Sequence, residues 1–278
     1  MRTRVTSIIN LKGGVAKTTT AINMAAILAA QGKRVLLIDA DPQANLTEFF
    51  GIHDPEKTCD CTLAELLDRD AAGRSDYAED YVRHTTEPNI DIVPGSIALI
   101  GADISSMLRP GSTSVRAIRD LIDNLNADAW AEAGVPEDGA DAYDFVLIDC
   151  PPSFTATSVA AIYASDDVII PVEADLFSVL GMTALLRQID GVRRISPRVR
   201  VAGVLICKQH NSAACVQGEA ALRASGVPVF DCTIRRSDKV TESIFKRLDL
   251  QQYSPRSAAG RDYRDFVDEY LEGGEHLG

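Results

Sequence analysis

The sequence predicts a single α/β domain with a mostly parallel central sheet and helices on both faces. Along its 278 residues, short β-branched and apolar runs alternate with segments of helical periodicity. Strand, helix and strand in repetition build a mainly parallel sheet joined by right-handed crossovers. A chain of this length can bury one large core, and no linker divides it. We therefore expect one domain over residues 1–278.

Six segments have the composition of strands buried on both faces, because each carries several apolar residues close together. In chain order they are Val5–Asn10, Arg34–Asp39, Asn89–Val93, Asp144–Asp149, Asp167–Pro171 and Val199–Ile206. The residue that ends such a strand lies at the carboxyl edge of the sheet, where open α/β folds bind their ligands.

Three helices have clear sequence signals. The first spans Thr18–Gln31 and ends at Gly32, which supplies the left-handed conformation of a helix C-terminus. The second spans Ser178–Arg194 and the third lies near the C-terminus, and both repeat apolar residues at helical spacing. Their buried faces are Met182, Leu185, Leu186 and Ile189 in the second, and Tyr263, Phe266, Val267, Tyr270 and Leu271 in the third. The acidic residues expected to point outward from the third helix are Asp262, Asp265 and Asp268.

One acidic segment interrupts this alternation. Residues 127–141 read ADAWAEAGVPEDGAD, which is rich in small residues and holds the single tryptophan of the chain. We expect an acidic surface loop here, ahead of the strand at Asp144–Asp149.

The strongest motif lies between the first strand and the first helix, where residues 11–19 read LKGGVAKTT. Glycines let backbone N–H groups turn inward around phosphate oxygens, and the helix N-terminus adds its positive dipole end. Lys17 is placed to neutralise the β- and γ-phosphates, and the Thr18 hydroxyl to bind Mg²⁺. The predicted nucleotide-binding residues of this loop are Lys12, Gly13, Gly14, Val15, Ala16, Lys17, Thr18 and Thr19.

Carboxylates end two of the predicted strands. Asp39 and Asp41 follow the second strand in the run Asp-Ala-Asp-Pro-Gln, and Asp149 follows four consecutive apolar residues. An apolar strand with an aspartate at its tip has the Walker B pattern, in which the carboxylate holds Mg²⁺ directly or through water. Together with the phosphate loop, these residues predict a P-loop NTPase fold.

The loop departs from the standard pattern G-x-x-x-x-G-K-[ST], because Leu11 and Ala16 stand where its glycines would be. The pattern K-G-G-x-x-K-T, with Lys12 five residues before Lys17, resembles the deviant Walker A group of P-loop ATPases, and within it the ParA/Soj-type partition proteins. The segments at 89–96, 170–181 and 234–243 fit the same family. The resemblance covers nearly the whole chain apart from residues 127–141 and is weakest over 53–88.

The resemblance implies a cytoplasmic ATPase that uses ATP and Mg²⁺ and forms a homodimer when ATP is bound. Lys12 would reach the nucleotide of the other subunit, Asp41 would position the attacking water, and Asp39 would lie near the water shell of the metal. The implied catalytic residues are Lys12, Lys17 and Asp41, and the implied metal-binding residues are Thr18, Asp39 and Asp149. Arg236 keeps the family arginine beside the adenine pocket, and Arg235 replaces the usual proline. Residues 205–211 lack the Asp-x-Arg commonly found there.

The family also binds DNA without sequence preference through basic residues of its C-terminal part. The net charge of −12 hides an asymmetry, since residues 1–184 carry 13 basic and 28 acidic side chains, and residues 185–264 carry 15 and 7. The DNA-binding candidates are Arg187, Arg193, Arg194, Arg198, Arg200, Lys239, Lys246 and Arg247. A ParB-like stimulating protein and association with the nucleoid are implied by the resemblance alone.

Other functions stay open. A P-loop switch that positions a protein cargo, a scaffold that binds ATP without hydrolysis, and a metabolite-dependent P-loop enzyme would share the motifs. A MinD-like membrane switch is disfavoured by the acidic C-terminal residues, and a nitrogenase-reductase-like iron–sulfur protein by the lack of a second cysteine to pair with Cys150. The chain contains no apolar run of membrane-spanning length, no CxxC pair and no histidine spacing typical of metal sites.

Overall fold

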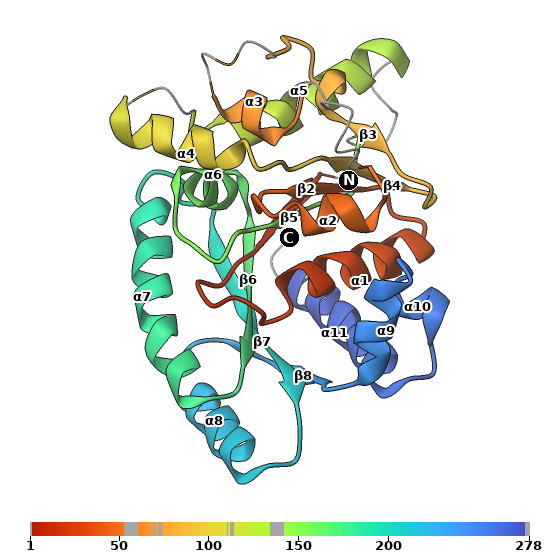
Figure 1. The fold of residues 1–278 in the computed structure, drawn as a ribbon, viewed down its shortest axis with the longest axis vertical. Helices are drawn as coiled ribbons and strands as arrows, with labels where there is room; N and C mark the ends of the chain where they lie inside the picture. The colour runs from red at the N-terminus through yellow and green to blue at the C-terminus, as the bar shows by residue number, and fades with distance from the viewer. Residues whose placement is uncertain are drawn as a thin grey trace.

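The computed structural model describes residues 2–52, 61–68, 71, 74–109, 111, 114–133 and 142–275. Within them the chain forms an eight-stranded sheet in the spatial order β3-β4-β2-β5-β1-β6-β7-β8, flanked by helices (Figure 1). The strands are β1 Arg4–Ile8, β2 Val35–Asp39, β3 Arg83–His84, β4 Ile90–Val93, β5 Phe145–Asp149, β6 Asp167–Glu173, β7 Arg200–Gln209 and β8 Val229–Arg235. All neighbouring strands run parallel except β3, which is antiparallel to β4. The predicted α/β fold is confirmed.

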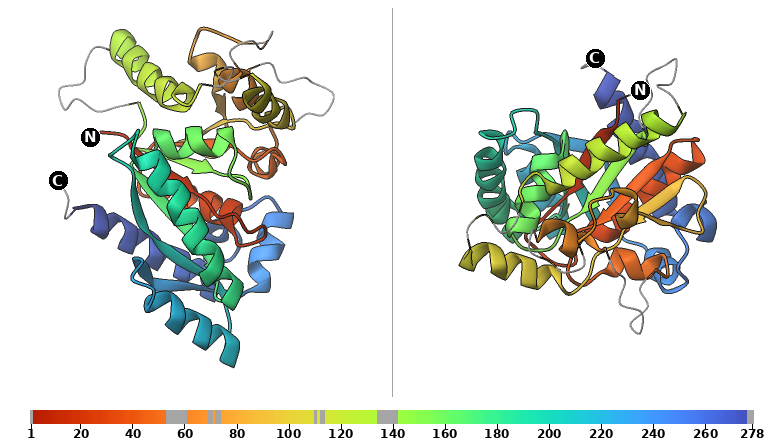
Figure 2. Two further views of the ribbon diagram at one scale, coloured as in Figure 1. Left: turned by 90° about the vertical axis from the view of Figure 1, so that its left-hand side faces the viewer. Right: turned by 90° about the horizontal axis from the view of Figure 1, so that it is seen from above.

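The longer helices cover both faces of the sheet (Figure 2). The helices are α1 Lys17–Ala30, α2 Asn45–Phe49, α3 Leu63–Leu67, α4 Leu99–Leu108, α5 Ala117–Ala133, α6 Ala156–Ala164, α7 Leu176–Arg193, α8 Ala213–Arg223, α9 Asp238–Phe245, α10 Leu250–Tyr253 and α11 Ala258–Glu275, with a 3₁₀ turn at Glu79–Tyr81. Helices α3 to α7 pack on one face and α1, α2, α10 and α11 on the other. None of the helices in the described ranges has the length and hydropathy that a membrane span requires.

The sheet separates two hydrophobic cores, one on each face, and side chains along the strands alternate between them. In β5, Val146 and Ile148 point to one core, while Phe145 and Leu147 point to the other. Such strands read as nearly continuous apolar runs, which is why the six central strands could be predicted. Strand β8 lies at an edge and mixes apolar with polar residues (VFDCTIR), and β3 has only two residues, so neither was predicted.

The predicted surface loop at 127–141 is wrong in its first half. Residues 127–133 are the C-terminal turns of α5, and residues 134–141 lie outside the described part of the chain. Alanine stands at 127, 129, 131 and 133, and alanine has the highest helix propensity of any residue. The small residues here extend a helix and do not mark a loop.

The C-terminal helix packs as predicted, with one exception. Tyr263, Phe266, Val267 and Tyr270 of α11 are buried against the sheet, and Asp265 and Asp268 are exposed. Asp262, which we expected to point outward, is only 5% exposed. It accepts hydrogen bonds from Arg235 of β8, so an ion pair with another element overrides the simple polar-out pattern.

Candidate nucleotide-binding site

A pocket of about 690 Å³ opens at the carboxyl ends of the strands. One wall is the loop between β1 and α1, and the facing wall is the segment from Ile234 to Ile244. Asp41 and Gln43, which follow β2, line it as well, and Cys207 and Tyr263 contribute from β7 and α11. The predicted motifs thus meet at one edge of the sheet, where open α/β folds bind ligands. The volume suits a nucleotide-sized molecule.

The β1–α1 loop has the open shape of a phosphate cradle. Gly14 adopts a left-handed φ of 74°, and a Cβ added at Gly13 or Gly14 would meet no atom within 4 Å. Ala16 takes φ 74° as the residue before α1, where no side chain caps the helix. Holding alanine there costs about 1–2 kcal/mol. The first residues of α1 line the pocket and have no side-chain cap, as at an anion-binding helix N-terminus.

Lys17 begins α1 and is nearly buried, with 7% of its surface exposed. Its Nζ donates to the Lys12 carbonyl oxygen at 3.3 Å. Burial lowers the pKa of Lys17, and the nearby charges of Asp149 and Asp41 oppose this shift. A desolvated ammonium with one weak hydrogen bond is a strong site for an anionic ligand. Of the other loop residues, Val15 is buried, whereas Thr18 and Thr19 line the pocket.

Two buried carboxylates lie side by side beneath the loop, since Asp39 of β2 and Asp149 of β5 are register partners. Both carboxylate oxygens of Asp39 accept hydrogen bonds. Its Oδ2 accepts from the Thr47 N–H at 2.8 Å and from the Thr47 hydroxyl at 2.7 Å. Its Oδ1 accepts from the Asp41 N–H at 3.2 Å. Burial raises the pKa of Asp39 to about 6 despite these bonds. A cation beside this pair would offset the cost of burying two carboxylates.

Asp149 differs from Asp39 because neither of its oxygens has a hydrogen-bond partner of good geometry among the described residues. The pKa of Asp149 is raised overall. Burial and the charge of Asp39 raise it, and they outweigh the Thr18 hydroxyl and Lys17, which lower it. Such an orphaned acceptor beside a hydroxyl fits a divalent cation. The described residues contain no cluster of three or more His, Cys, Asp or Glu that could hold a metal. Mg²⁺ binds through few protein ligands plus phosphates and water, and Asp149 and the Thr18 hydroxyl are the side chains that could hold it here.

Asp41 stands apart from the buried pair. It is 9% exposed, lines the pocket, and its Oδ1 accepts from the Gln43 N–H at 2.9 Å. One carboxylate oxygen is thus fixed by the backbone while the group faces the pocket. This arrangement can orient a water molecule.

Lys12 does not point into its own pocket. Its Nζ forms an ion pair with Asp175 Oδ2 at 2.5 Å, and Asp175 caps α7 by accepting from the Ser178 N–H at 2.8 Å. Partial burial raises the pKa of Asp175, but the hydrogen bonds from Lys12 and Ser178 outweigh it and the net shift is downward. Both partners are about 40% exposed, so the pair can exchange partners at modest cost.

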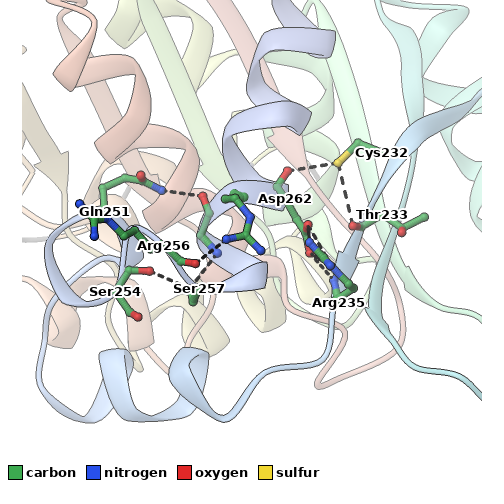
Figure 3. A network of polar contacts seen from close by, with 10 residues as sticks. Cys232, Thr233, Arg235, Gln251, Ser254, Arg256, Ser257 and Asp262 are labelled. Carbon is green, nitrogen blue, oxygen red and sulfur yellow. Dashed lines mark hydrogen bonds and ion pairs between the residues drawn. The ribbon is translucent and has the colours of Figure 1, made fainter.

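The facing wall is anchored by the ion pair between Arg235 and Asp262 (Figure 3). The guanidinium donates to both carboxylate oxygens at 2.5 to 3.2 Å, and the Arg235 N–H adds a bond at 2.9 Å. Arg235 therefore ties β8 to α11. Arg236 is exposed and lines the pocket, and its N–H donates to the Gln209 carbonyl oxygen.

Several supporting residues were not predicted. Thr47 clamps Asp39, and a Cβ at Gly95 would lie 2.5 Å from the Asp39 carbonyl oxygen, so only glycine fits there. Asp175 holds Lys12, and Lys208 crosses the pocket. The Asp-x-x-Ser sequence at 175–178 is a helix-capping signal that could have drawn attention to Asp175.

The basic candidates fall into two groups instead of forming one face. Helices α7 and α9 lie on opposite sides of the molecule in Figures 1 and 2. The first group follows α7 and its exit (Arg187, Arg193, Arg194, Arg198 and Arg200), and the second follows α9 (Lys239, Lys246 and Arg247). Several are neutralised: Arg200 pairs with buried Asp167 at 2.5 Å, Lys239 with Glu242 at 2.6 Å, and Arg247 with Glu48.

Fold and loop together define a P-loop nucleotide-binding protein. A model of the AAA domain matches residues 3–201. The chromosome partitioning protein ParA of Caulobacter vibrioides is 35% identical over 273 residues, covering 96% of this chain and 94% of that protein. The sporulation initiation inhibitor protein Soj of Bacillus subtilis is 31% identical over 274 residues, covering 98% and 99%. The chain belongs to the ParA/Soj family of partition ATPases, as the motifs predicted.

Among solved structures, cobyrinic acid a,c-diamide synthase from Mycobacterium smegmatis with bound ADP and magnesium is 28% identical. The alignment covers 99% of this chain and 96% of that one, with a TM-score of 0.75. The same fold therefore occurs in a metabolite-directed enzyme.

Proposed function

We propose that the protein is an ATP-dependent dimer switch that binds DNA without sequence preference and acts in plasmid or chromosome partition. The observation that carries the proposal is an open phosphate cradle and a buried lysine that line one pocket, with an orphaned carboxylate, Asp149, close to Lys17 and Thr18. Membership of the ParA/Soj family supports partition as the setting. In this proposal the nucleotide state decides whether the protein is a monomer or a DNA-bound dimer.

The geometry of the site supports a proposed role for each residue. Lys17 and the N–H groups of the cradle bind the phosphates of ATP, and Thr18 with Asp149 would hold Mg²⁺. When bound, magnesium supplies positive charge to the phosphate oxygens. Asp41 orients the attacking water. Asp39 is occupied by Thr47, so its role is to fix the shape of the edge, with Mg²⁺ contact only through water.

Lys12 is the residue that links the two subunits. In one protomer its ammonium is held by Asp175, about 40% exposed, at the open face of the loop. On dimerisation Lys12 exchanges this carboxylate for the nucleotide of the partner, which places a positive charge where negative charge develops during phosphoryl transfer. The exchange replaces one charge-assisted hydrogen bond by another, so its net cost is small.

Lys12→Ala is expected to abolish ATP-dependent dimerisation and to slow turnover by about 1000-fold, the range of a cation supplied in trans. Asp175→Asn should keep both properties, because it removes only the contact that Lys12 leaves. Light scattering after size-exclusion chromatography with ATP, together with phosphate release, measures both. A Lys12→Ala protein that still dimerises and turns over normally would refute the trans role.

The α7 group is the better candidate for the DNA face. Arg187 and Arg194 are exposed, seven residues apart on one side of α7, and pair with no carboxylate among the described residues. In the α9 group, Lys239 and Arg247 are neutralised by their neighbours. Unpaired exposed cations release counterions from phosphates, which gives sequence-independent affinity.

The double variant Arg187→Glu/Arg194→Glu is expected to weaken ATP-dependent DNA binding at least about 10-fold at low salt. The slope of log affinity against log salt should fall by about one for each arginine that contacts phosphate. The matched reversal Lys239→Glu/Lys246→Glu should have a smaller effect. Fluorescence anisotropy with a random-sequence duplex measures both, and an unchanged affinity for the α7 variant would remove this face from the proposal.

Two further elements of the proposal come from the family alone. We expect a ParB-like DNA-binding protein that stimulates hydrolysis, and association of the ATP form with the nucleoid. A metabolite-dependent enzyme is the second candidate, favoured by the likeness to cobyrinic acid a,c-diamide synthase. Turnover that responds to a small carboxylic acid and ignores DNA would favour it.

A further inference from the structure

Lys208 lies across the nucleotide pocket, near the end of β7. Its Nζ donates to the Gly14 carbonyl oxygen of the phosphate loop at 2.5 Å and lies 3.9 Å from Glu173 Oε1, at the end of β6. All three residues line the pocket, and the Lys208 side chain is 43% exposed. None of the motifs that predict the site includes this lysine.

The backbone holds Lys208 in an uncommon conformation. Its φ is 54°, in the left-handed region that a residue with a long side chain seldom adopts. The next residue, Gln209, accepts a hydrogen bond from the Arg236 N–H at 2.9 Å. Lys208 thus stands between the two walls of the pocket, with its side chain reaching the phosphate loop and its neighbour tied to the facing wall.

We propose that Lys208 contacts the phosphate chain of the bound nucleotide, exchanging the Gly14 carbonyl for a phosphate oxygen. The inference rests on the proposed ATP-binding function. A nucleotide held in the cradle and extending to the Ile234–Ile244 wall would occupy the pocket that Lys208 lines. A charge-assisted bond to phosphate is about twice as strong as a bond between neutral groups.

The charge of Glu173 strengthens the argument. This carboxylate lines the pocket and is 40% exposed, so it repels an anionic ligand. An ammonium beside it offsets that repulsion. Lys208 therefore acts in two ways, by contacting phosphate directly and by screening a carboxylate that the pocket wall carries.

The test is equilibrium binding of fluorescent ATP and ADP analogues to the full chain with Mg²⁺. Lys208→Met is expected to weaken binding of ATP by about 10-fold or more, the effect of losing a hydrogen bond to a charged group. Lys208→Arg keeps the charge and should restore most of the affinity. Lys33→Met, just beyond the far end of α1 from the phosphate loop, is the matched control and should bind like the unaltered protein.

The variant Lys208→Gly separates the effect of losing the ammonium from the effect of the left-handed backbone conformation. Glycine suits the left-handed φ, so this variant should melt no lower than the unaltered protein and yet bind ATP as weakly as Lys208→Met. Full affinity in Lys208→Gly or in Lys208→Met would overturn the inference while leaving the proposed function intact. An unaltered protein that fails to bind ATP would overturn both.

Discussion

Lys17→Ala is expected to lower the affinity for ATP by about 100-fold or more and to abolish turnover, the largest effect of any single change in the pocket. Lys17 is nearly buried, its hydrogen bond to the Lys12 carbonyl oxygen is long at 3.3 Å, and burial lowers its pKa. Burial of this ammonium costs free energy in the folded protein, and binding of phosphate offsets that cost. Without Lys17, the site has one positive charge fewer to offset the repulsion between the buried carboxylates and an anionic ligand.

Isothermal titration with ATP and Mg²⁺ measures this effect. Lys33→Ala removes a lysine just beyond the other end of the same helix, about 20 Å away by helix rise, and should bind ATP normally. Thermal unfolding of both variants without nucleotide shows whether either has lost its fold. Normal ATP affinity in a folded Lys17→Ala protein would contradict the assignment of the pocket.

Asp41→Ala is expected to leave ATP binding nearly intact and to slow hydrolysis by about 100- to 1000-fold. The carboxylate faces the pocket, with one oxygen fixed by the Gln43 N–H, and its loss removes a water-orienting group without disturbing the cradle. The ATP-bound dimer should then persist and remain on DNA. Asp39→Ala would be a different experiment, because Asp39 anchors Thr47 in the interior.

Single-turnover phosphate release measures the hydrolysis rate apart from nucleotide exchange. Asp265→Ala, an exposed acid on α11, serves as the matched control. If Asp41→Ala hydrolysed ATP at the normal rate, another group would have to position the water. If it failed to bind ATP, its role would lie in the binding site instead of the chemical step.

The central fold and the phosphate-binding edge could be predicted from sequence because their signals are local. A buried parallel strand is a run of apolar residues, and an aspartate at its end lies at the carboxyl edge whatever the rest of the chain does. For this reason the structure pairs Asp39 with Asp149 at the carboxyl ends of β2 and β5 and places Asp41 in the pocket lining, while their roles stay predictions. Edge strand β8 lacks such a run and was missed.

Contacts between distant parts of the chain could not be predicted. Lys12 and Asp175 are 163 residues apart, Lys208 and Gly14 are 194 apart, and neither pair has a local sequence pattern. Asp262 looked like an exposed helix residue because its partner, Arg235, lies in another element. The basic residues of the C-terminal part looked like one cluster in sequence, but α7 and α9 carry them to opposite sides.

We propose that ATP controls DNA binding. The most direct test is the fluorescence anisotropy of a random-sequence duplex mixed with the protein and ATP, ADP or no nucleotide. We predict binding with ATP only, falling steeply with salt and lost in Lys17→Ala. Equal binding in all three nucleotide states, or none with ATP in a protein that still dimerises, would contradict the claim.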